Sequence, residues 1–590
     1  MVRTMFVATI RRGHVISPVG PGALTLLPNR VSVIVTAPAA WMRSLPDRPA
    51  GSIGVLDELS ITDRHLQAAT LVDRFVQPPA AENPPVRDRD WVLPAARFPL
   101  MDACVNPQCQ RLIERDNTDS NEGRCTHCAI GRRRWPTFQV ATVLACQNGH
   151  LADIDWSGVL HDGEPCAAPQ VRYSVGASPA RPRLKCEACH REVTFDPEQD
   201  FPCPGERPWL PGAGAQDCQL RARPLERSST TMYYAQQLSA LTLPVAGATN
   251  PTLVHALLDN PALAPLLRLD AGGRREDTLA EIVRIAGRLG ITTTRDEVVA
   301  HLDALGSEAS TPPSREAELD ALTSDEYSRH VTGHLPDLIV ERQDPAGYAT
   351  LLGDTLTGVS AVPRLRETRI LAGFTRIEPA PADPPRGYEQ MWGKEHPQTF
   401  SAGARDDWLP GYRVYGEGIL VVLDEQTCQT WAATAAHDPR VLDAAVEFPT
   451  IALDPVRGVL AHTMAHLLMR ALAPQSGYPL PALRERLFVS DTRTAFLIYT
   501  AAGDIDGTLG GLVELATPDR LALLLDEAIN SADWCSTDPV CGEGHPHLGG
   551  HGTAPGACHH CLYVPETSCE AFNQGLDRKL VTDFMRHLGR

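Results

Sequence analysis

The chain has 590 residues, of which 43% are hydrophobic and 21% charged, a composition that excludes a fibrous or globally disordered protein. At roughly 100–200 residues per domain, this length predicts a multidomain protein with several separate cores. The formal net charge of −18 excludes a nucleic-acid footprint over the whole surface, so any contact with DNA must be local.

No segment reaches the roughly 20 consecutive apolar residues that a membrane span needs. The apolar run at the start is followed too quickly by RRGH for a secretory signal. We therefore expect a cytoplasmic protein with no membrane partner. In a reducing cytosol, the 16 cysteines are better explained as metal ligands than as disulfides.

Periodicity and turn residues predict an α+β multidomain protein made of five segments. Residues 1–100 form a β-rich region, with RVSVIVTAP as a clear run, and residues 101–225 form zinc-ribbon-like cysteine modules. Residues 226–345 form a helical region that TMYYAQQLSALTLPV opens and that continues with apolar residues at helical spacing. Residues 346–450 mix helix and strand, with GEGILVVLDEQ as the clearest strand.

Residues 451–590 predict a C-terminal α/β domain with a cysteine zinc site. DPVRGVLAHTMAHLLMRALA is a strongly apolar helix, RLFVSDTRTAFLIYTAA gives two strands, and PDRLALLLDEAINSA is a helix that leads into the last cysteines. Between them, GDIDGTLGGL contains two carboxylates among glycines. We expect a turn there, since the later ligands of a calcium loop are missing.

The first cysteine cluster predicts a structural Zn²⁺ site. Its two short pairs, in CVNPQC and CTHC, are separated by fifteen residues. Each pair can form a turn that directs two thiolates at one ion, and two pairs complete a tetrahedral site with no open position for catalysis. The predicted ligands are Cys104, Cys109, Cys125 and Cys128.

The second cluster offers seven potential ligands, more than one ion needs. The pair in CEACH and the two cysteines that follow make the better set of four thiolates, namely Cys186, Cys189, Cys203 and Cys218. Three ligands remain. Cys146, His150 and Cys166 could form another centre, but with only three ligands visible we favour buried structural residues.

The third cluster ends in ACHHCLYVPETSCE, residues 557–570, where five thiols compete for four positions. The first choice of ligands is Cys535, Cys541, Cys558 and Cys561, and the alternative has Cys569 in place of Cys535. Five nearby histidines could substitute for a cysteine: His545, His547, His551, His559 and His560. Across the chain we expect two to three structural zinc sites, with Cys428 left as a core or surface thiol.

Motifs for catalysis are incomplete. His462 and His466 share one helical face, as zincin histidines do, but Thr463 stands where the general-base glutamate belongs. We therefore favour two hydrogen-bonded histidines on a packed helix over a metal site. GILVVLDEQ resembles a Walker B strand, yet the sequence contains neither GxxxxGK[ST] nor GxSxG. We assign no catalytic residues and no cofactor other than zinc.

Basic stretches among the cysteines are the best candidates for a DNA contact. RDRDW, GRRRWP, RPRLK and RARPLER lie within residues 86–225. A local basic surface of this kind can bind phosphates. Solvated loops around folded zinc knuckles are the simpler interpretation, and we favour it.

Several stretches in order carry a family resemblance. The C-terminal segments HTMAHLLMRAL, LIYTAAGDIDGTLGGL and CHHCLYVPETSCE resemble the zinc-binding domain of unknown function that ends MrfA-type DNA-repair helicases. RRGHVISPVGPGAL, ACQNGHLADIDW, CPGERPWLP, STTMYYAQQLSALTLP and LRETRILAGFTRIEP resemble the DrmB family, the helicase-associated components of DISARM anti-phage systems. The resemblance covers nearly the whole chain and is weakest in the helical middle.

The resemblance implies a non-catalytic accessory subunit that binds the superfamily 2 helicase DrmA, as a heterodimer, and helps it engage foreign DNA. DNA would be contacted through the complex. A metal-dependent nuclease and a stand-alone DNA-repair or DNA-binding module are the alternatives. The insert GEGHPHLGGHGTAPGA between Cys541 and Cys558 departs from the family pattern and weakens the ligand assignment there.

Overall fold

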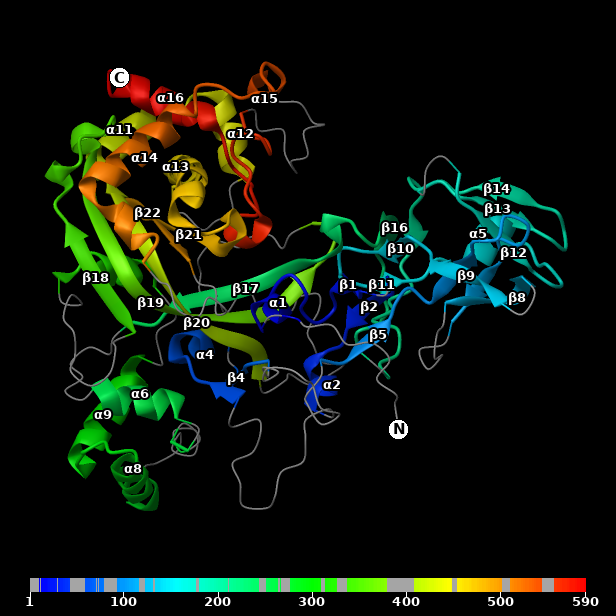
Figure 1. Ribbon diagram of the computed structural model, residues 1–590, viewed down its shortest axis with the longest axis horizontal. Helices are drawn as coiled ribbons and strands as arrows, with labels where there is room; N and C mark the ends of the chain where they lie inside the picture. The colour runs from blue at the N-terminus through cyan, green and yellow to red at the C-terminus, as the bar shows by residue number, and fades with distance from the viewer. Residues whose placement is uncertain are drawn as a thin grey trace.

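The computed structural model shows a body built on one large sheet and a cysteine-rich arm that projects from it (Figure 1). The description covers residues 10, 12–28, 30–42, 59–70, 72, 74–78, 93–115, 123–130, 133–176, 180–210, 212–243, 251–260, 262–263, 266, 276–308, 314–325, 337–378, 408–447, 454–500, 510–543 and 556–590.

Eight strands make the sheet of the body, and its central path runs β17-β19-β20-β22-β21. All its pairs are antiparallel except β4 with β20. The two central strands are 20 and 16 residues long, so they extend well past their neighbours. The strands are β3 (Ser60–Ile61), β4 (Arg74–Val76), β17 (Tyr234–Leu241), β18 (Leu338–Gln343), β19 (Leu356–Thr375), β20 (Trp408–Leu423), β21 (Leu483–Val489) and β22 (Thr494–Thr500).

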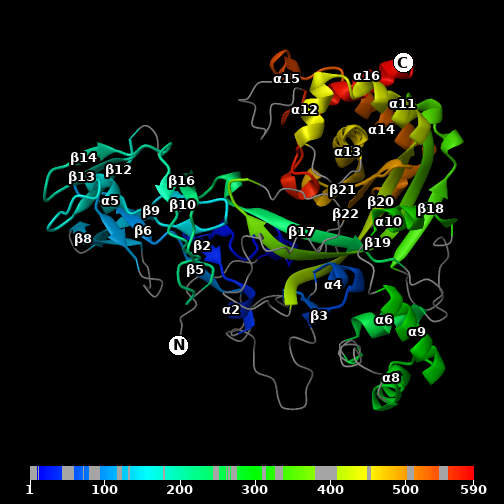
Figure 2. The same cartoon turned by 180° about the vertical axis from the view of Figure 1, so that it is seen from behind.

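C-terminal helices cover one face of this sheet, and Figure 2 shows the same layer from behind. At its centre lies α13 (Pro455–Ser476), which Asp454 caps by accepting hydrogen bonds from the backbone of Val456 and Arg457. Most of its side chains are buried, as expected of a helix enclosed by protein. The others are α11 (Glu425–Ala435), α12 (Pro439–Glu447), α14 (Pro518–Asn530), α15 (Val540–Glu543) and α16 (Arg578–His587). None of the described helices combines the length and apolarity needed to cross a membrane.

The N-terminal elements pack against the other part of the sheet, in a second core that includes Ile34, Phe75 and Phe374. They are α1 (Arg12–Ile16), β1 (Leu24–Leu26), β2 (Ser32–Val35), α2 (Pro38–Met42), α4 (Arg64–Thr70) and β5 (Ala95–Arg97). The run RVSVIVTAP is β2, as predicted, and it pairs with both β1 and β5.

Three small sheets build the arm, each too small to enclose much apolar surface. Their orders are β7-β6-β9-β8, β11-β10-β16-β15 and β12-β13-β14. The elements are β6 (Met101–Cys104), β7 (Leu112–Glu114), β8 (Arg124–Ile130), β9 (Arg133–Gln139), β10 (Thr142–Ala145), β11 (Leu151–Ala152), α5 (Trp156–His161), β12 (Val171–Ser174), β13 (Arg183–Cys186), β14 (Glu192–Thr194), β15 (Phe201–Pro202) and β16 (Arg221–Glu226).

The helical middle contains α6 (Pro251–Asp259), α8 (Glu276–Arg288), α9 (Arg295–Glu308) and α10 (Arg315–Leu322). The first three share a small core of their own. One prediction is wrong here: TMYYAQQLSALTLPV opens no α-helix. The short 3-10 helix η1 (Thr230–Met232) comes first, and Tyr234–Leu241 then forms strand β17 paired with β19. Backbone pairing with a long neighbouring strand overrides the local helix preference of Ala, Gln and Leu.

The predicted α+β class, with cysteine clusters, helices in the middle and a C-terminal α/β region, is confirmed. The strand in GEGILVVLDEQ, the helices α13 and α14 and the strand pair β21 and β22 all form where expected. The turn in GDIDGTLGGL lies largely outside the described residues.

Candidate metal centres

The first cysteine group comes together as the spacing predicts. Cys104 ends β6, Cys125 and Cys128 lie in β8, and the Sγ atoms of Cys104 and Cys128 are 3.5 Å apart. The pair Cys109 and Cys125 is separated by 3.9 Å. Four thiolates at about 2.3 Å from one Zn²⁺ would have Sγ–Sγ edges near 3.8 Å, so the donor set fits this ion. These distances are far longer than a disulfide bond, which is about 2.05 Å.

A second group joins Cys146 and His150 to Cys203 and Cys218, with all four ligand atoms within 4.8 Å of one another. The Nδ1 atom of His150 lies 3.4 Å from Cys146 Sγ and 3.5 Å from Cys203 Sγ. Its Nε2 faces the Gln216 Oε1 oxygen at 3.1 Å, which can only accept, so Nε2 carries the proton and Nδ1 is free to bind a metal. Burial lowers the pKa of His150, which favours the neutral form that a metal requires.

A third group joins His161 and Cys166 to Cys186 and Cys189. His161 ends α5, and its Nδ1 atom donates to the carbonyl of Ser157 at 2.8 Å, so Nε2 is left for a ligand. Burial acts to raise the pKa of Cys186, but hydrogen bonds from the backbone of Cys189 and Gln170 and from His161 outweigh it and lower that pKa to about 5. A thiolate is therefore favoured at this position.

The second and third groups correct the predicted ligand set of Cys186, Cys189, Cys203 and Cys218. These four cysteines do not share one site. Cys186 ends β13 in one sheet, whereas Cys203 follows β15 in another, where the pairing of β10 with β16 brings it beside Cys146. The interpretation of Cys146, His150 and Cys166 as buried structural residues is also revised, since each lies among potential ligands.

His161 is a residue that the sequence interpretation missed. It stands five positions before Cys166 in HDGEPC, a His and Cys near a CxxC pair, and this spacing was the available signal. The described residues thus contain three ligand groups in the arm, where two were expected, and each could hold a metal ion.

The C-terminal group has the first-choice composition, Cys535 with Cys541, Cys558 and Cys561. The Sγ–Sγ distances are 3.6 Å for Cys535 and Cys558, 3.7 Å for Cys541 and Cys561, and 3.8 Å for Cys558 and Cys561. The backbone N–H of His560 donates to Cys558 Sγ, an arrangement that stabilises a thiolate. His559 and His560 are exposed and stand outside the group, and the other three candidate histidines lie outside the described residues.

Cys569 does not belong to that group. Its Sγ atom lies 3.1 Å from Nε2 of His462, in a fully enclosed cluster with His466 and Glu485. The predicted hydrogen-bonded histidine pair of α13 is present, with ring centroids 4.4 Å apart. Glu485 had no signal in the sequence, because it lies on β21 and reaches the histidines only through tertiary packing.

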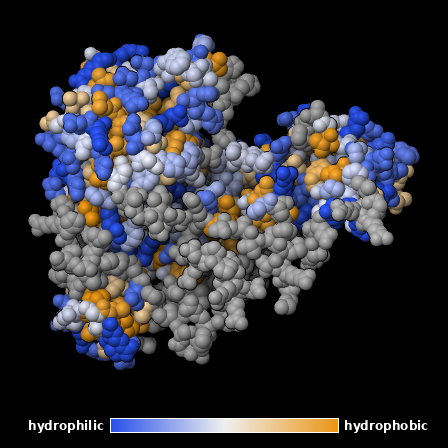
Figure 3. Space-filling model, viewed as in Figure 1, coloured by the Kyte–Doolittle hydropathy of each residue, from blue (hydrophilic) through white to orange (hydrophobic). Residues whose placement is uncertain are grey.

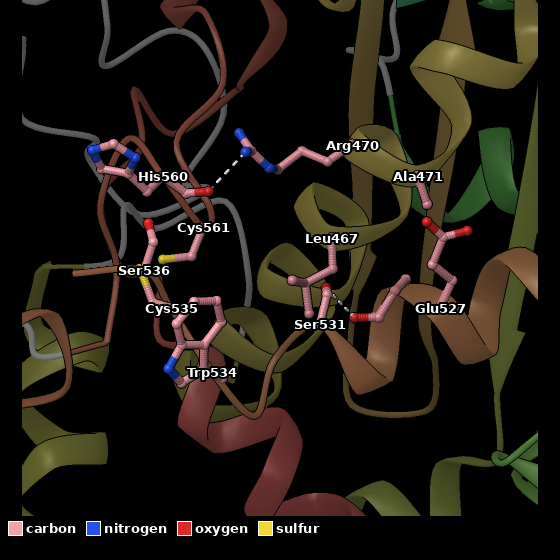
Figure 4. Close-up of a pocket in the computed structure, with 11 residues that line it drawn as sticks. Leu467, Arg470, Ala471, Glu527, Ser531, Trp534, Cys535, Ser536, His560 and Cys561 are labelled. Carbon is pink, nitrogen blue, oxygen red and sulfur yellow. Dashed lines mark hydrogen bonds between the residues drawn. The ribbon is translucent and has the colours of Figure 1, made fainter. Parts of the chain in front are cut away.

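A depression of about 270 Å³ borders the C-terminal group, and Figure 4 shows its lining. Arg470 of α13 donates to the carbonyls of His560 and Tyr563 and so fixes the cysteine-bearing segment on the helix. Trp534, which precedes the first cysteine of the group, is 70% exposed. Trp and Arg are both enriched at contact surfaces for other proteins.

Several basic side chains of the arm are paired with carboxylates. These ion pairs are Arg111–Glu187, Arg181–Asp196, Arg183–Glu192, Lys185–Glu192, Arg191–Glu164 and Arg223–Asp200. The tip of the arm is mostly hydrophilic in the view of Figure 3. Mixed charge of this kind matches solvated loops around knuckles better than a continuous phosphate-binding strip.

Arg376 joins the arm to the body. Its three guanidinium nitrogens donate to the carbonyls of Gly149 (2.8 Å), Met232 (2.6 Å) and Gly22 (2.7 Å), and the side chain is fully buried. The guanidinium also lies 5.3 Å from the ring of Trp209. Gly22 has φ of 84°, and a Cβ there would lie 2.4 Å from the Phe374 ring. The five N-terminal stretches that carry the family resemblance therefore meet at this one side chain.

Comparison with known proteins supports the family resemblance. Residues 11–234 match a family model described as Domain of unknown function (DUF8724). The chain is 26% identical over 525 residues to the DISARM protein DrmB of Bacillus paralicheniformis, covering 83% of this chain and 89% of that protein. The resemblance noted from the sequence is thereby confirmed at the level of a DrmB-like protein, while the resemblance of the C-terminal domain to MrfA-type helicases stays a prediction.

Proposed function

We propose that this DrmB-like chain is a non-catalytic accessory subunit of a DISARM-type anti-phage system, which binds the superfamily 2 helicase DrmA and helps it engage foreign DNA. The observation that carries the proposal is the similarity to DrmB along 83% of the chain. Similarity over that length spans most of the chain, so it supports a shared role of the whole molecule.

The metal groups support a scaffold role. A group of four thiolates, or of three thiolates and a histidine, fills all four positions of a tetrahedral ion and leaves none for a substrate or water. We therefore propose that Zn²⁺ in these groups stabilises modules whose own cores are small. The ligands we assign are the arm and C-terminal groups described above.

DNA is engaged through the complex in this proposal. Ion pairs engage part of the basic side chains of the arm, and the net charge of −18 opposes DNA binding by the isolated chain. The helicase would supply most of the phosphate contacts, and this subunit would position it.

The test is size-exclusion chromatography of the chain with DrmA, together with the DNA-stimulated ATPase activity of DrmA alone and in the mixture. We expect comigration and an altered ATPase rate. Separate elution with an unchanged rate would refute the accessory role. Divalent-metal-dependent DNA cleavage by the isolated chain, abolished by EDTA, would instead favour a nuclease.

Two surface variants locate the contact. Trp534→Ala removes the exposed ring beside the C-terminal group. We expect it to weaken the affinity for DrmA at least tenfold, as at an interface hot spot, and so to reduce comigration. Leu26→Ala is the matched control, since Leu26 is also an exposed apolar residue, 61% exposed, on distant strand β1. Equal effects of the two variants would exclude the Trp534 surface.

A further inference from the structure

We propose that His462, His466, Glu485 and Cys569 bind a structural Zn²⁺ in the core of the C-terminal domain, separate from the neighbouring four-cysteine group. The two histidines are one turn apart on α13, Glu485 lies on β21, and Cys569 follows the 3-10 helix η8 (Glu566–Ser568). The cluster thus joins three segments that are distant in the sequence.

The distances match a tetrahedral ion. His462 Nε2 lies 3.1 Å from Glu485 Oε1 and 3.1 Å from Cys569 Sγ, and His466 Nε2 lies 3.3 Å from Glu485 Oε2. All four ligand atoms are within 4.8 Å of one another. Zinc bonds of about 2.0–2.3 Å predict ligand–ligand edges of roughly 3.3–3.6 Å, close to these values.

The hydrogen bond of His466 fixes its tautomer. Its Nδ1 atom lies 3.0 Å from the carbonyl oxygen of Leu562, which can only accept, so Nδ1 carries the proton. In a neutral ring, the lone pair of Nε2 then faces a carboxylate oxygen. Two acceptors at 3.3 Å repel each other unless a cation or a proton lies between them. A metal-bound histidine with its other nitrogen on a backbone carbonyl is the usual arrangement.

Charge balance favours a metal over protons. Glu485 is 1% exposed, and within the part of the chain that the structure describes its ion-pair partners are the two imidazoles alone. The adjacent Arg486 pairs with Glu318 and faces the other side of the strand. One proton would leave the second imidazole facing the carboxylate. Two protons would leave an excess of positive charge if Cys569 is a thiol, and would place two imidazolium rings 4.4 Å apart in the core if it is a thiolate. Zn²⁺ with one carboxylate, one thiolate and two neutral imidazoles is neutral and satisfies all four groups.

The surroundings support a thiolate and a closed site. The backbone N–H groups of Ala571 and Asn573 donate to Cys569 Sγ at 3.3 and 3.2 Å. His462 and His466 are fully buried, and Cys569 is 7% exposed. Four protein ligands in an enclosed core leave no position for a substrate, so the ion would stabilise the contact of α13 with β21 and the C-terminal segment.

The direct test is anomalous diffraction at the zinc edge from crystals of the zinc-loaded wild-type chain. We expect a peak at the centre of the four ligand atoms, about 2 Å from each. A map with peaks at the four-cysteine group but none among these residues would overturn the proposal, and this result requires no variant to fold.

Metal content of variants gives an independent measurement. We expect Cys569→Ser and His466→Gln each to lose one zinc per chain by elemental analysis. Cys428→Ser is the matched control, because Cys428 is a fully buried thiol of the same core, lies outside all the ligand groups and should leave the zinc content unchanged. Unchanged zinc in folded Cys569→Ser and His466→Gln would contradict the proposal.

Discussion

Replacement of Arg376 by Met should destabilise the junction between the arm and the body more than any substitution on the surface. Met has a similar length, so the loss is mainly that of the hydrogen bonds. Three buried carbonyls, those of Gly22, Gly149 and Met232, would lose their donor. Each unsatisfied buried acceptor costs about 1–3 kcal/mol. The relief from no longer burying a guanidinium offsets part of this sum, and we expect a net destabilisation of about 3–5 kcal/mol.

The assay is urea denaturation of the full chain, with hydrogen exchange of the peptides that contain the three carbonyls as the local measurement. Arg376→Lys should give an intermediate loss, because an ammonium cannot reproduce the planar set of donors. Arg342→Met is the control: Arg342 is 50% exposed and pairs with Asp325, so its loss should cost about 1 kcal/mol or less. Equal stability of Arg376→Met and the control, with unchanged exchange, would refute the reasoning.

The double variant Cys186→Ser with Cys203→Ser should lose two zinc ions per chain by elemental analysis, because the two cysteines lie in different groups. A loss of one zinc ion would instead indicate that both cysteines bind the same ion. Glu318→Gln should destabilise the chain by about 1.5–3 kcal/mol in urea denaturation, since Arg486 would lose its charge-assisted hydrogen bonds to Glu318 and keep only the more distant carboxylates of Glu367 and Glu570. A change below 1 kcal/mol would contradict a buried ion pair. Burial raises the pKa of Asp153 from 3.8 to about 6, so the folded state binds a proton at this carboxyl group more tightly than the unfolded state does. The free-energy cost of burying the ionised carboxylate is therefore present above pH 6 and is relieved as the pH falls toward 4. Asp153→Asn should therefore raise the melting temperature at pH 7.5 and have less effect at pH 5, and an equal effect at both pH values would exclude this titration.

The sequence alone determined the local features of this protein. Cysteine pairs with two to five residues between them predicted the knuckles, because so short a segment can direct both thiolates at one point without the rest of the fold. The cysteines of the first and C-terminal groups come together in the structure as this spacing predicts. Apolar residues at helical spacing likewise located α8, α9, α13 and α14.

Only the tertiary structure decided which knuckles share a site and which distant residues complete them. The pairing of β10 with β16 places Cys146 and His150 beside Cys203, and the packing of α5 against β13 places His161 beside Cys186. Packing of α13 on β21 brings Glu485 to the two histidines. These contacts join residues about 20 to 60 positions apart in the sequence, and strand register and helix packing fix them. The spacing of residues along the chain does not specify the strand register or the helix packing.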